Sequence, residues 1–272
     1  MTYPAMDHLD AIGHRVANAP RVLLGLDFDG TLAAIANQPE SVTLSVEMRD
    51  VLHRLANGSQ ISVAVISGRT LEDVRQRIAI ESIHYAGDHG MEIDGPAVKW
   101  KDPVAVACVD RLSEIIERLE STLATIDGAR VERKRFTASV HYRHVAPADV
   151  PRLTKLVIAV LRQMGASVFK LSSGLKVLEI SPCTASSKGL AMRQIAAGLS
   201  PQPTLAMFLG DDVTDEDAFQ EIAGHVTIKV GPQRPTVAEF GLDDTGHVMQ
   251  FLNWLAGLVP STCCQRNQHE LK

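Results

Sequence analysis

The sequence predicts an α/β protein with a Rossmann-like core built on a parallel sheet. Short apolar runs alternate with segments of helical periodicity, and five of the runs end in polar or glycine-containing segments. The alternation is typical of βα units, and polar residues at the strand ends mark the edge of the sheet where open α/β folds bind ligands. A stretch in the middle of the chain breaks the rhythm, which indicates an inserted second domain.

The N-terminal third of the chain contains the first βα units. Strands are expected at residues 22–26, 61–66 and 83–86, because each is a short run of apolar side chains. The helix after the first strand is expected to begin at Ser45, and the helix after the second at Thr70. Both are residue types that cap a helix N-terminus.

The insert is predicted to be an α+β cap domain over residues 97–180. Apolar positions spaced for a helix alternate there with segments of period two, which suits an antiparallel sheet covered on one face. The expected elements are a long helix, two strands, a second helix and a hairpin, at residues 102–126, 130–145, 148–164 and 167–180. We expect the hairpin to turn at Ser172-Ser173-Gly174.

The βα rhythm resumes after the insert. A helix is expected at 187–197, a strand at 204–209, a helix from Thr214 and a strand at 226–230. The core is therefore discontinuous in sequence, and it is assembled from residues 1–96 and 181–272.

Composition limits the kinds of partner. The 272 residues are 45% hydrophobic and carry a net charge of -5, so nucleic acid and anionic membranes are not attracted in general. The first residues lack a secretory signal, and no apolar run approaches the ~20 residues of a membrane span. We expect a soluble, cytoplasmic protein in which any anionic substrate is held by local positive groups. The four cysteines, Cys108, Cys183, Cys263 and Cys264, lack zinc-site spacing and are expected to be reduced thiols.

Two carboxylates directly follow the first strand, in Asp27-Phe28-Asp29-Gly30. Residues i and i+2 of an extended chain point to the same side, and two adjacent carboxylates repel unless a cation or a shared proton relieves them. A Mg²⁺ site with an aspartate nucleophile is the leading interpretation, and a surface turn is the alternative. A calcium-binding EF-hand loop is excluded, because its first and twelfth positions would be Gly25 and Ala36.

Other polar residues have ordinary explanations when taken alone. Ser67 and Lys188 lie near expected helix starts, where their side chains and the free N–H groups of the helix can bind an anion. Taken alone, Ser67 is explained equally simply as a helix cap, and Lys188 as a solvated lysine in the first turn. His89 lies in a glycine-flanked turn, where histidine is usually structural. In the insert, alternation puts Glu132 and Lys134 on one strand face, and such charged faces are usually only solvated.

The motifs taken together resemble the haloacid dehalogenase superfamily of phosphatases. The resemblance is carried by residues 27–32, 67–69, 188–189 and 210–219, which read DFDGTL, SGR, KG and GDDVTDEDAF. Within that superfamily, the last string together with residues 131–134, 141–143 and 178–180 is similar to the trehalose-6-phosphate phosphatases. The similarity extends over about residues 20–256.

This resemblance implies roles for the core residues. Asp27 would attack phosphorus to give an aspartyl-phosphate, and Asp29 would act as acid and base while its main-chain carbonyl faces Mg²⁺. The carboxylates of Asp27 and Asp211 would complete the metal site. Asp212 and Asp215 would not bind the metal but would orient the residues that do. Ser67 would offer a hydroxyl and Lys188 a positive charge to the phosphoryl oxygens, as the corresponding residues do in that superfamily, and both would stabilise the charge of the transition state.

The resemblance also implies a mobile cap and a substrate. The residues expected to contact the substrate are Gly30, His89, Gly90, Glu132, Lys134, Arg143 and Glu179. Ser181 stands where the family has an arginine, and Asp88 adds an acid beside His89. The implied reaction is Mg²⁺-dependent hydrolysis of trehalose 6-phosphate. Another sugar phosphate such as sucrose phosphate or mannosyl-3-phosphoglycerate, a phosphomutase reaction, and a non-catalytic sugar-phosphate sensor are the alternatives.

Overall fold

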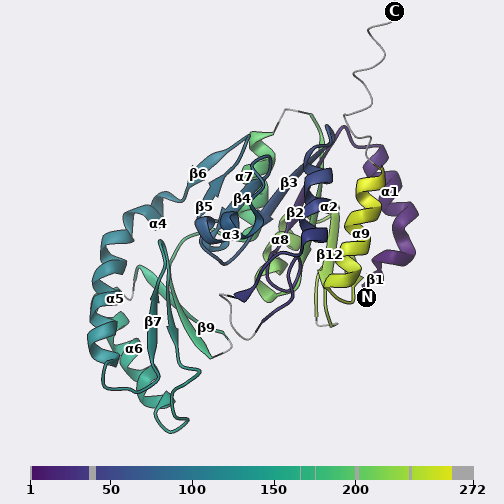
Figure 1. Ribbon diagram of the computed structural model, residues 1–272. Coiled ribbons are helices and arrows are strands. Elements are labelled where there is room, and N and C mark those ends of the chain that lie inside the picture. The colour runs from purple at the N-terminus through teal and green to yellow at the C-terminus, as the bar shows by residue number, and fades with distance from the viewer. Residues whose placement is uncertain are drawn as a thin grey trace, which may run out of the picture. The chain divides into compact units, whose positions relative to one another are not determined.

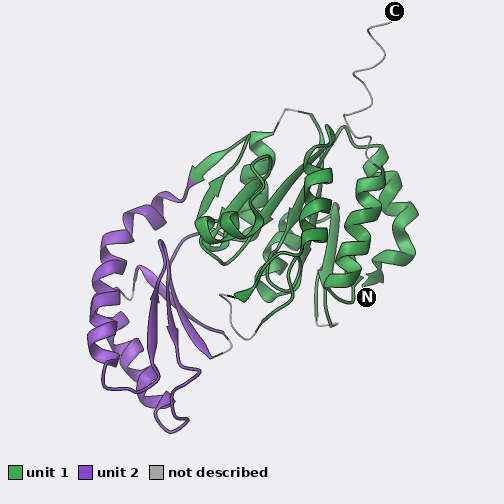
Figure 2. Ribbon diagram, viewed as in Figure 1, with its two compact units in different colours: residues 1–100, 186–272 green, residues 101–185 purple. Residues whose placement is uncertain are grey.

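The computed structural model describes residues 2–36, 41–165, 167–174, 176–199, 202–232 and 235–258. The chain forms two compact units, unit 1 of residues 1–100 with 186–272 and unit 2 of residues 101–185 (Figure 2). These bounds lie a few residues beyond those expected from the sequence. The Cys263-Cys264 segment lies outside the described residues.

Unit 1 is built on a nine-stranded sheet in the order β1-β13-β12-β11-β2-β3-β4-β5-β6 (Figure 1). All neighbours from β1 to β4 are parallel, and β5 joins β4 in antiparallel fashion. The predicted α/β class with a parallel sheet is confirmed. The strands are β1 Tyr3–Pro4, β2 Arg21–Leu26, β3 Ile61–Ile66, β4 His84–Gly87, β5 Glu92–Asp94, β6 Lys99–Lys101, β11 Thr204–Gly210, β12 Val226–Val230 and β13 Phe240–Leu242.

Helices cover both faces of this sheet (Figure 1). Val22, Leu24 and Leu26 of β2 point to one face, where they join a buried cluster with α1, α2, α3 and α9. Leu23 points to the other face, where α7 and α8 pack. The helices are α1 Leu9–Ala17, α2 Val46–Ala56, α3 Leu71–Ile78, α7 Lys188–Gly198, α8 Glu216–Glu221 and α9 Thr245–Leu258, with short 3₁₀ turns at Ala5–His8, Asp88–Gly90 and Val213–Asp215.

Side-chain caps fix where the helices near the strand ends begin. The Ser45 hydroxyl accepts from the N–H of Met48 at the start of α2, and Thr70 accepts from the N–H of Asp73 at the start of α3. Ser187 caps α7 in the same way. The expected helix starts at Ser45 and Thr70 are confirmed, and such caps supply a partner for an N–H group that has none within the helix.

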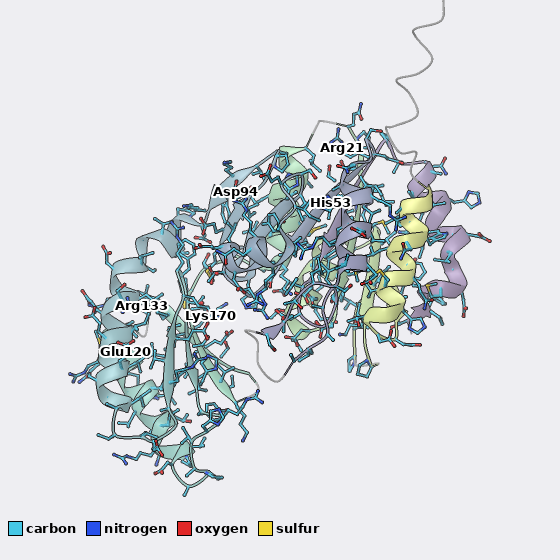
Figure 3. The ribbon with its side chains drawn as sticks, viewed as in Figure 1. Arg21, His53, Asp94, Glu120, Arg133 and Lys170 are labelled. Carbon is cyan, nitrogen blue, oxygen red and sulfur yellow. The ribbon has the colours of Figure 1, made fainter. Side chains whose placement is uncertain are left out.

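Unit 2 is a four-stranded antiparallel sheet in the order β7-β8-β10-β9 with helices on one face. Val140 and Leu178 point into a buried cluster with the apolar stripes of α5 and α6. Figure 3 shows Arg133 on β7 and Lys170 on β9 of this sheet. The elements are α4 Pro103–Ala107, α5 Val109–Leu123, β7 Arg130–Arg133, β8 Ala138–His141, α6 Val150–Met164, β9 Phe169–Gly174 and β10 Val177–Pro182.

Two expectations for unit 2 were wrong. The single helix over 102–126 is broken at Cys108, whose ψ of -8° ends α4 before α5 begins. Asp102 caps the start of α4, and helical periodicity does not reveal the interruption after Ala107. The hairpin turn was placed too early, because Ser172 and Gly174 still pair with Glu179 and Val177 of β10.

No helix among the described residues is long and apolar enough to cross a bilayer.

Candidate active site

The carboxyl ends of three adjacent strands bring the core motifs together. Asp27 follows β2, Ser67 follows β3 and Asp211 follows β11, and the sheet order places β2 between the other two. The main-chain N–H of Asp27 donates to the carbonyl of Leu209, which continues the pairing of β2 with β11 by one bond. The convergence on one edge, expected from βα topology, is therefore realised in unit 1.

Lys188 links two buried carboxylates. Its Nζ lies 2.6 Å from Oδ1 of Asp27 and 2.6 Å from Oδ1 of Asp215, and all three side chains are almost fully buried. Burial opposes a charge on Lys188, but Asp27 and Asp215 outweigh it and raise its pKa. Lys188 is the first residue of α7, directly after the Ser187 cap, so its position depends on where that helix begins.

Asp27, Asp211 and Asp215 form a cluster of carboxylates. Oxygens from the three side chains lie within 4.8 Å of one another. Burial raises the pKa of Asp27 well above its usual value, against the lowering charge of Lys188, with Asp215 and Asp211 adding to the rise. Burial, followed by the charge of Asp215, raises the pKa of Asp211 to about 6. Lys229 and Lys188 oppose the rise at Asp211, but burial and the neighbouring carboxylate of Asp215 prevail.

The oxygens of this cluster fit a hard divalent cation. Oδ1 of Asp211 is buried and has no hydrogen-bond partner in the described part of the chain. Both oxygens of Asp215 are engaged, Oδ1 by Lys188 and Oδ2 by the main-chain N–H of Asp212 at 2.8 Å. Mg²⁺ takes oxygen ligands and readily keeps several waters, so a partly protein-bound site suits it. Among the described residues, Asp211 therefore offers an oxygen without a hydrogen-bond partner, whereas Asp215 is held in place by its neighbours.

Asp29 is paired with an arginine from the next strand end. Arg69 donates from Nε to Oδ2 at 2.6 Å and from Nη2 to Oδ1 at 2.7 Å. The same guanidinium donates to Asp73 at 2.9 Å and lies over the Phe28 ring, 5.4 Å from its centre. The sequence interpretation gave Arg69 no role. The sequence does contain a signal for this pair, because Arg69 follows β3 and Asp29 follows β2, and these strands are neighbours in the sheet.

Ser67 is buried within the same edge, and its hydroxyl accepts from the main-chain N–H of Arg69 at 3.2 Å. The cap of α3 is Thr70, so the simple explanation of Ser67 as that cap is wrong. The hydroxyl proton of Ser67 is not used in this bond, and it can be donated to an anion.

Glycine is required beside the carboxylates. Gly30 has φ of 88°, and a Cβ there would lie 2.1 Å from Oδ2 of Asp211. Its backbone can approach the cluster only because it carries no side chain.

His89 lies in a strained turn next to Ser67. Asp88, His89 and Gly90 have φ of 49°, 56° and 95°, and such values are uncommon for the first two because they are not glycine. The N–H of His89 donates to the carbonyl of Ser67 at 2.9 Å, and its ring packs so closely on Gly68 that a Cβ there would clash. Backbone strain of this kind is often concentrated at functional sites.

The polar residues expected in the insert are brought together in part. Lys134 Nζ lies 3.5 Å from Oε1 of Glu179, and Oε2 of Glu132 lies 2.6 Å from Nε2 of His141. Arg143 is exposed and makes no side-chain hydrogen bond with the described residues. Sequence interpretation included His141 in a motif and assigned it no role.

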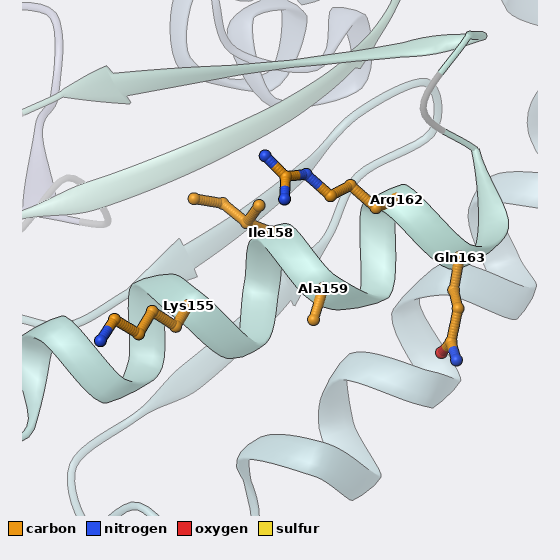
Figure 4. A pocket seen from close by; sticks show the side chains of 5 residues that line it. All are labelled: Lys155, Ile158, Ala159, Arg162 and Gln163. Atoms are coloured by element: carbon orange, nitrogen blue, oxygen red, sulfur yellow. The ribbon is translucent and has the colours of Figure 1, made fainter.

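A pocket lies elsewhere in unit 2, on α6. It is lined by Lys155, Ile158, Ala159, Arg162 and Gln163 (Figure 4). None of the predicted site residues is among the described residues that line it, which all lie on α6.

The geometry can be compared with known proteins. The model of the trehalose-phosphatase family matches residues 25–245. The chain belongs to the trehalose-phosphatase family. "Probable trehalose-phosphate phosphatase 2" of Oryza sativa subsp. japonica is 34% identical, over 89% of this chain and 69% of that protein. The expected family resemblance is confirmed.

Other similar proteins differ in length. An "Uncharacterized glycosyl hydrolase" of Mycobacterium tuberculosis is 38% identical over 89% of this chain, and the match spans only 19% of that protein. The C-terminal domain of Candida albicans trehalose-6-phosphate phosphatase has a TM-score of 0.76 at 22% identity, covering 92% of this chain and 97% of that domain. At this identity, the structural likeness establishes the fold.

Proposed function

We propose that this member of the trehalose-phosphatase family is a Mg²⁺-dependent phosphatase that hydrolyses trehalose 6-phosphate to trehalose and phosphate. One observation carries the chemistry: a buried Asp27 is paired with Lys188 beside an Asp211 oxygen that has no hydrogen-bond partner among the described residues. A structural ion pair needs no additional unpaired carboxylate. A site that binds a phosphate ester together with a metal cation needs all three groups, namely the Asp27 carboxylate, the Lys188 ammonium and the unpaired Asp211 oxygen.

Asp27 is the proposed nucleophile. Its carboxylate oxygen forms a bond to phosphorus while the bond from phosphorus to the sugar oxygen breaks, and Asp29 gives that oxygen a proton. Water then attacks the phosphorus of the aspartyl-phosphate, giving its proton to Asp29 as phosphate leaves and Asp27 is regenerated. The aspartyl-phosphate intermediate replaces one difficult displacement by two easier ones. Proton transfer by a positioned group contributes about 10²- to 10⁴-fold.

The remaining core residues hold and neutralise the phosphoryl group. Lys188 brings a positive charge to the buried Asp27, and Ser67 supplies a hydroxyl donor at the adjacent strand end. Mg²⁺ would be held by Asp27, Asp211 and the carbonyl of Asp29, and it would stabilise the negative charge on the phosphoryl oxygens. Asp215 keeps Lys188 and Asp212 in place around these groups.

Sugar recognition is assigned to both units by residue type. In unit 1, Gly30, His89 and Gly90 are proposed to lie against the substrate, because all three sit at the edge that carries Asp27 and Ser67. In unit 2, Glu132, Lys134 and Glu179, together with Arg143, provide the acceptors and donors that sugar hydroxyls require. Unit 2 is proposed to act as the cap domain of the enzyme.

A substrate panel tests the proposal. Phosphate release is measured with Mg²⁺ for trehalose 6-phosphate, sucrose phosphate, mannosyl-3-phosphoglycerate and hexose phosphates, with Asp27→Asn as the control. Trehalose 6-phosphate should have the highest kcat/KM, and the variant should release none. A better substrate elsewhere in the panel would reassign the sugar. An isomeric sugar phosphate without free phosphate would indicate a mutase, and binding without turnover a sensor.

A further inference from the structure

One face of the unit 2 sheet carries aligned polar side chains. Glu132 of β7, Ser139 of β8 and Glu179 of β10 are directly opposite one another in register. The next row along contains Arg130 and His141, also opposite one another. Residues that pair across neighbouring strands share a face, and the opposite face is the one that packs on α5 and α6. These polar residues therefore form a single surface, here called the polar row.

Each carboxylate of the polar row is fixed through one oxygen. Oε1 of Glu179 has Ser139 Oγ at 3.3 Å and Lys134 Nζ at 3.5 Å. Oε2 of Glu132 has His141 Nε2 at 2.6 Å. The other oxygen of each carboxylate has no hydrogen-bond partner among the described residues. Both acids are partly exposed, with 38% of the Glu132 side chain and 33% of that of Glu179 accessible.

We propose that His141 is a positioning residue for sugar recognition, which holds Glu132 so that its second oxygen accepts from a sugar hydroxyl. A free glutamate side chain loses rotamer entropy when it is fixed by a ligand. A partner that fixes it beforehand reduces this cost and strengthens binding. The hydrogen bond from His141 is also the main reason that the pKa of Glu132 is lowered, which keeps the side chain an acceptor.

The spacing of the polar row fits a ligand with hydroxyls at both ends. Glu132 and Glu179 lie on either side of Ser139, so their strands are two spacings apart, roughly 10 Å. A disaccharide is long enough to offer hydroxyls to both carboxylates, and Lys134 adds a donor for a sugar oxygen. This inference rests on the proposed function for the identity of the sugar, and on unit 2 alone for the geometry.

Kinetics with two substrates tests the role of His141. His141→Ala should raise KM for trehalose 6-phosphate about tenfold, which corresponds to about 1.4 kcal/mol. It should leave kcat for that ester and both constants for p-nitrophenyl phosphate within about twofold. His141→Gln, which keeps a donor, should recover most of the KM. His144→Ala removes an exposed histidine from the same segment and should behave as the unaltered protein.

A double-substitution cycle separates positioning from a direct contact with the sugar. If His141 acts only through Glu132, His141→Ala should add little to the loss already caused by Glu132→Ala. An unchanged KM in His141→Ala, full additivity in the cycle, or equal losses with p-nitrophenyl phosphate would overturn the inference.

Binding without turnover keeps this test independent of the catalytic proposal. Calorimetric titration of Asp27→Asn protein with trehalose 6-phosphate gives Kd directly, and adding His141→Ala should weaken it about tenfold. An unaltered protein that binds this ester but does not hydrolyse it would contradict the proposed function and still report on His141. An unchanged Kd, or no binding at all, would contradict the role of His141.

Discussion

Arg69 holds both carboxylate oxygens of Asp29, through Nε at 2.6 Å and Nη2 at 2.7 Å. The two residues come from adjacent strand ends, and Arg69 is itself fixed by Asp73 and by the Phe28 ring. A bidentate pair of this kind sets direction as well as distance. Asp29, the proposed acid-base residue, therefore receives its orientation from the strand next to its own.

Removing Arg69 should impair the step in which the sugar oxygen leaves. Arg69→Met should lower kcat for trehalose 6-phosphate roughly ten- to a hundredfold, within the range of general acid-base effects. The loss should be much smaller for p-nitrophenyl phosphate, whose leaving group needs no proton. Arg69→Lys should recover only part of the rate, because an ammonium cannot make the same paired contact. Equal losses with both esters would mean that Arg69 supports the fold and not Asp29.

Mg²⁺ should stabilise the protein through Asp211. A ligand at a hundred times its Kd raises the free energy of unfolding by about 2.7 kcal/mol. Thermal unfolding in excess Mg²⁺ and in chelator should therefore differ clearly for the unaltered chain. The difference should disappear in Asp211→Asn, and Asp212→Asn, an exposed neighbour, should keep most of it. A full Mg²⁺ effect in Asp211→Asn would place the cation elsewhere.

Asp73 should contribute a stability that depends on pH. Burial opposes its ionisation, but hydrogen bonds from Arg77 and Arg69 prevail and lower its pKa. Its contribution is complete above the unfolded value of about 3.9, and it is lost as the pH falls through the lower pKa of the folded state. Asp73→Asn should reduce the free energy of unfolding by roughly 1 kcal/mol at pH 7.

Urea unfolding at pH 7 and near pH 2.5 measures the contribution of Asp73. The difference between the unaltered protein and Asp73→Asn should shrink at the lower pH. Glu117→Gln removes an exposed carboxylate on α5 and should change little at either pH. A difference for Asp73→Asn that stays constant with pH would argue against its ion pairs as the cause.

Gly30 should be intolerant of a methyl group. Gly30→Ala combines a left-handed backbone, which costs roughly 1–2 kcal/mol, with a contact at 2.1 Å to the Asp211 carboxylate. Gly224→Ala has a similar φ of 87° but meets nothing within 4 Å, so it isolates the backbone cost. Urea unfolding and Mg²⁺ titration should show a loss of cation affinity for Gly30→Ala only. Similar behaviour of both variants would mean that the crowding beside Asp211 is unimportant.

Much of the core could be predicted because its signals are local. The run Ile61–Ile66 is a strand with the bounds that its apolar side chains indicate, and Ser45 and Thr70 cap helices as their residue types suggest. Parallel topology then brings Asp27, Ser67 and Asp211 to one edge without further information. The residues of this edge follow from chain order and strand direction alone.

The remainder depends on contacts distant in sequence or on single backbone angles. The pairing of Arg69 with Asp29 requires knowledge of which strands are neighbours, and that of His141 with Glu132 requires the register of β7 and β8. The break at Cys108 is one ψ angle within a continuous apolar stripe. Periodicity reports which face is buried, and it does not report a local interruption of the helix.

The central claim is that Asp27 carries the phosphoryl group during turnover. Acid quenching of the protein during turnover of ³²P-labelled trehalose 6-phosphate, followed by peptide mapping, measures this directly. The account predicts acid-stable label on the peptide that contains Asp27, and neither label nor released phosphate from Asp27→Asn. Label on another residue, or substantial phosphate release by Asp27→Asn, would contradict it.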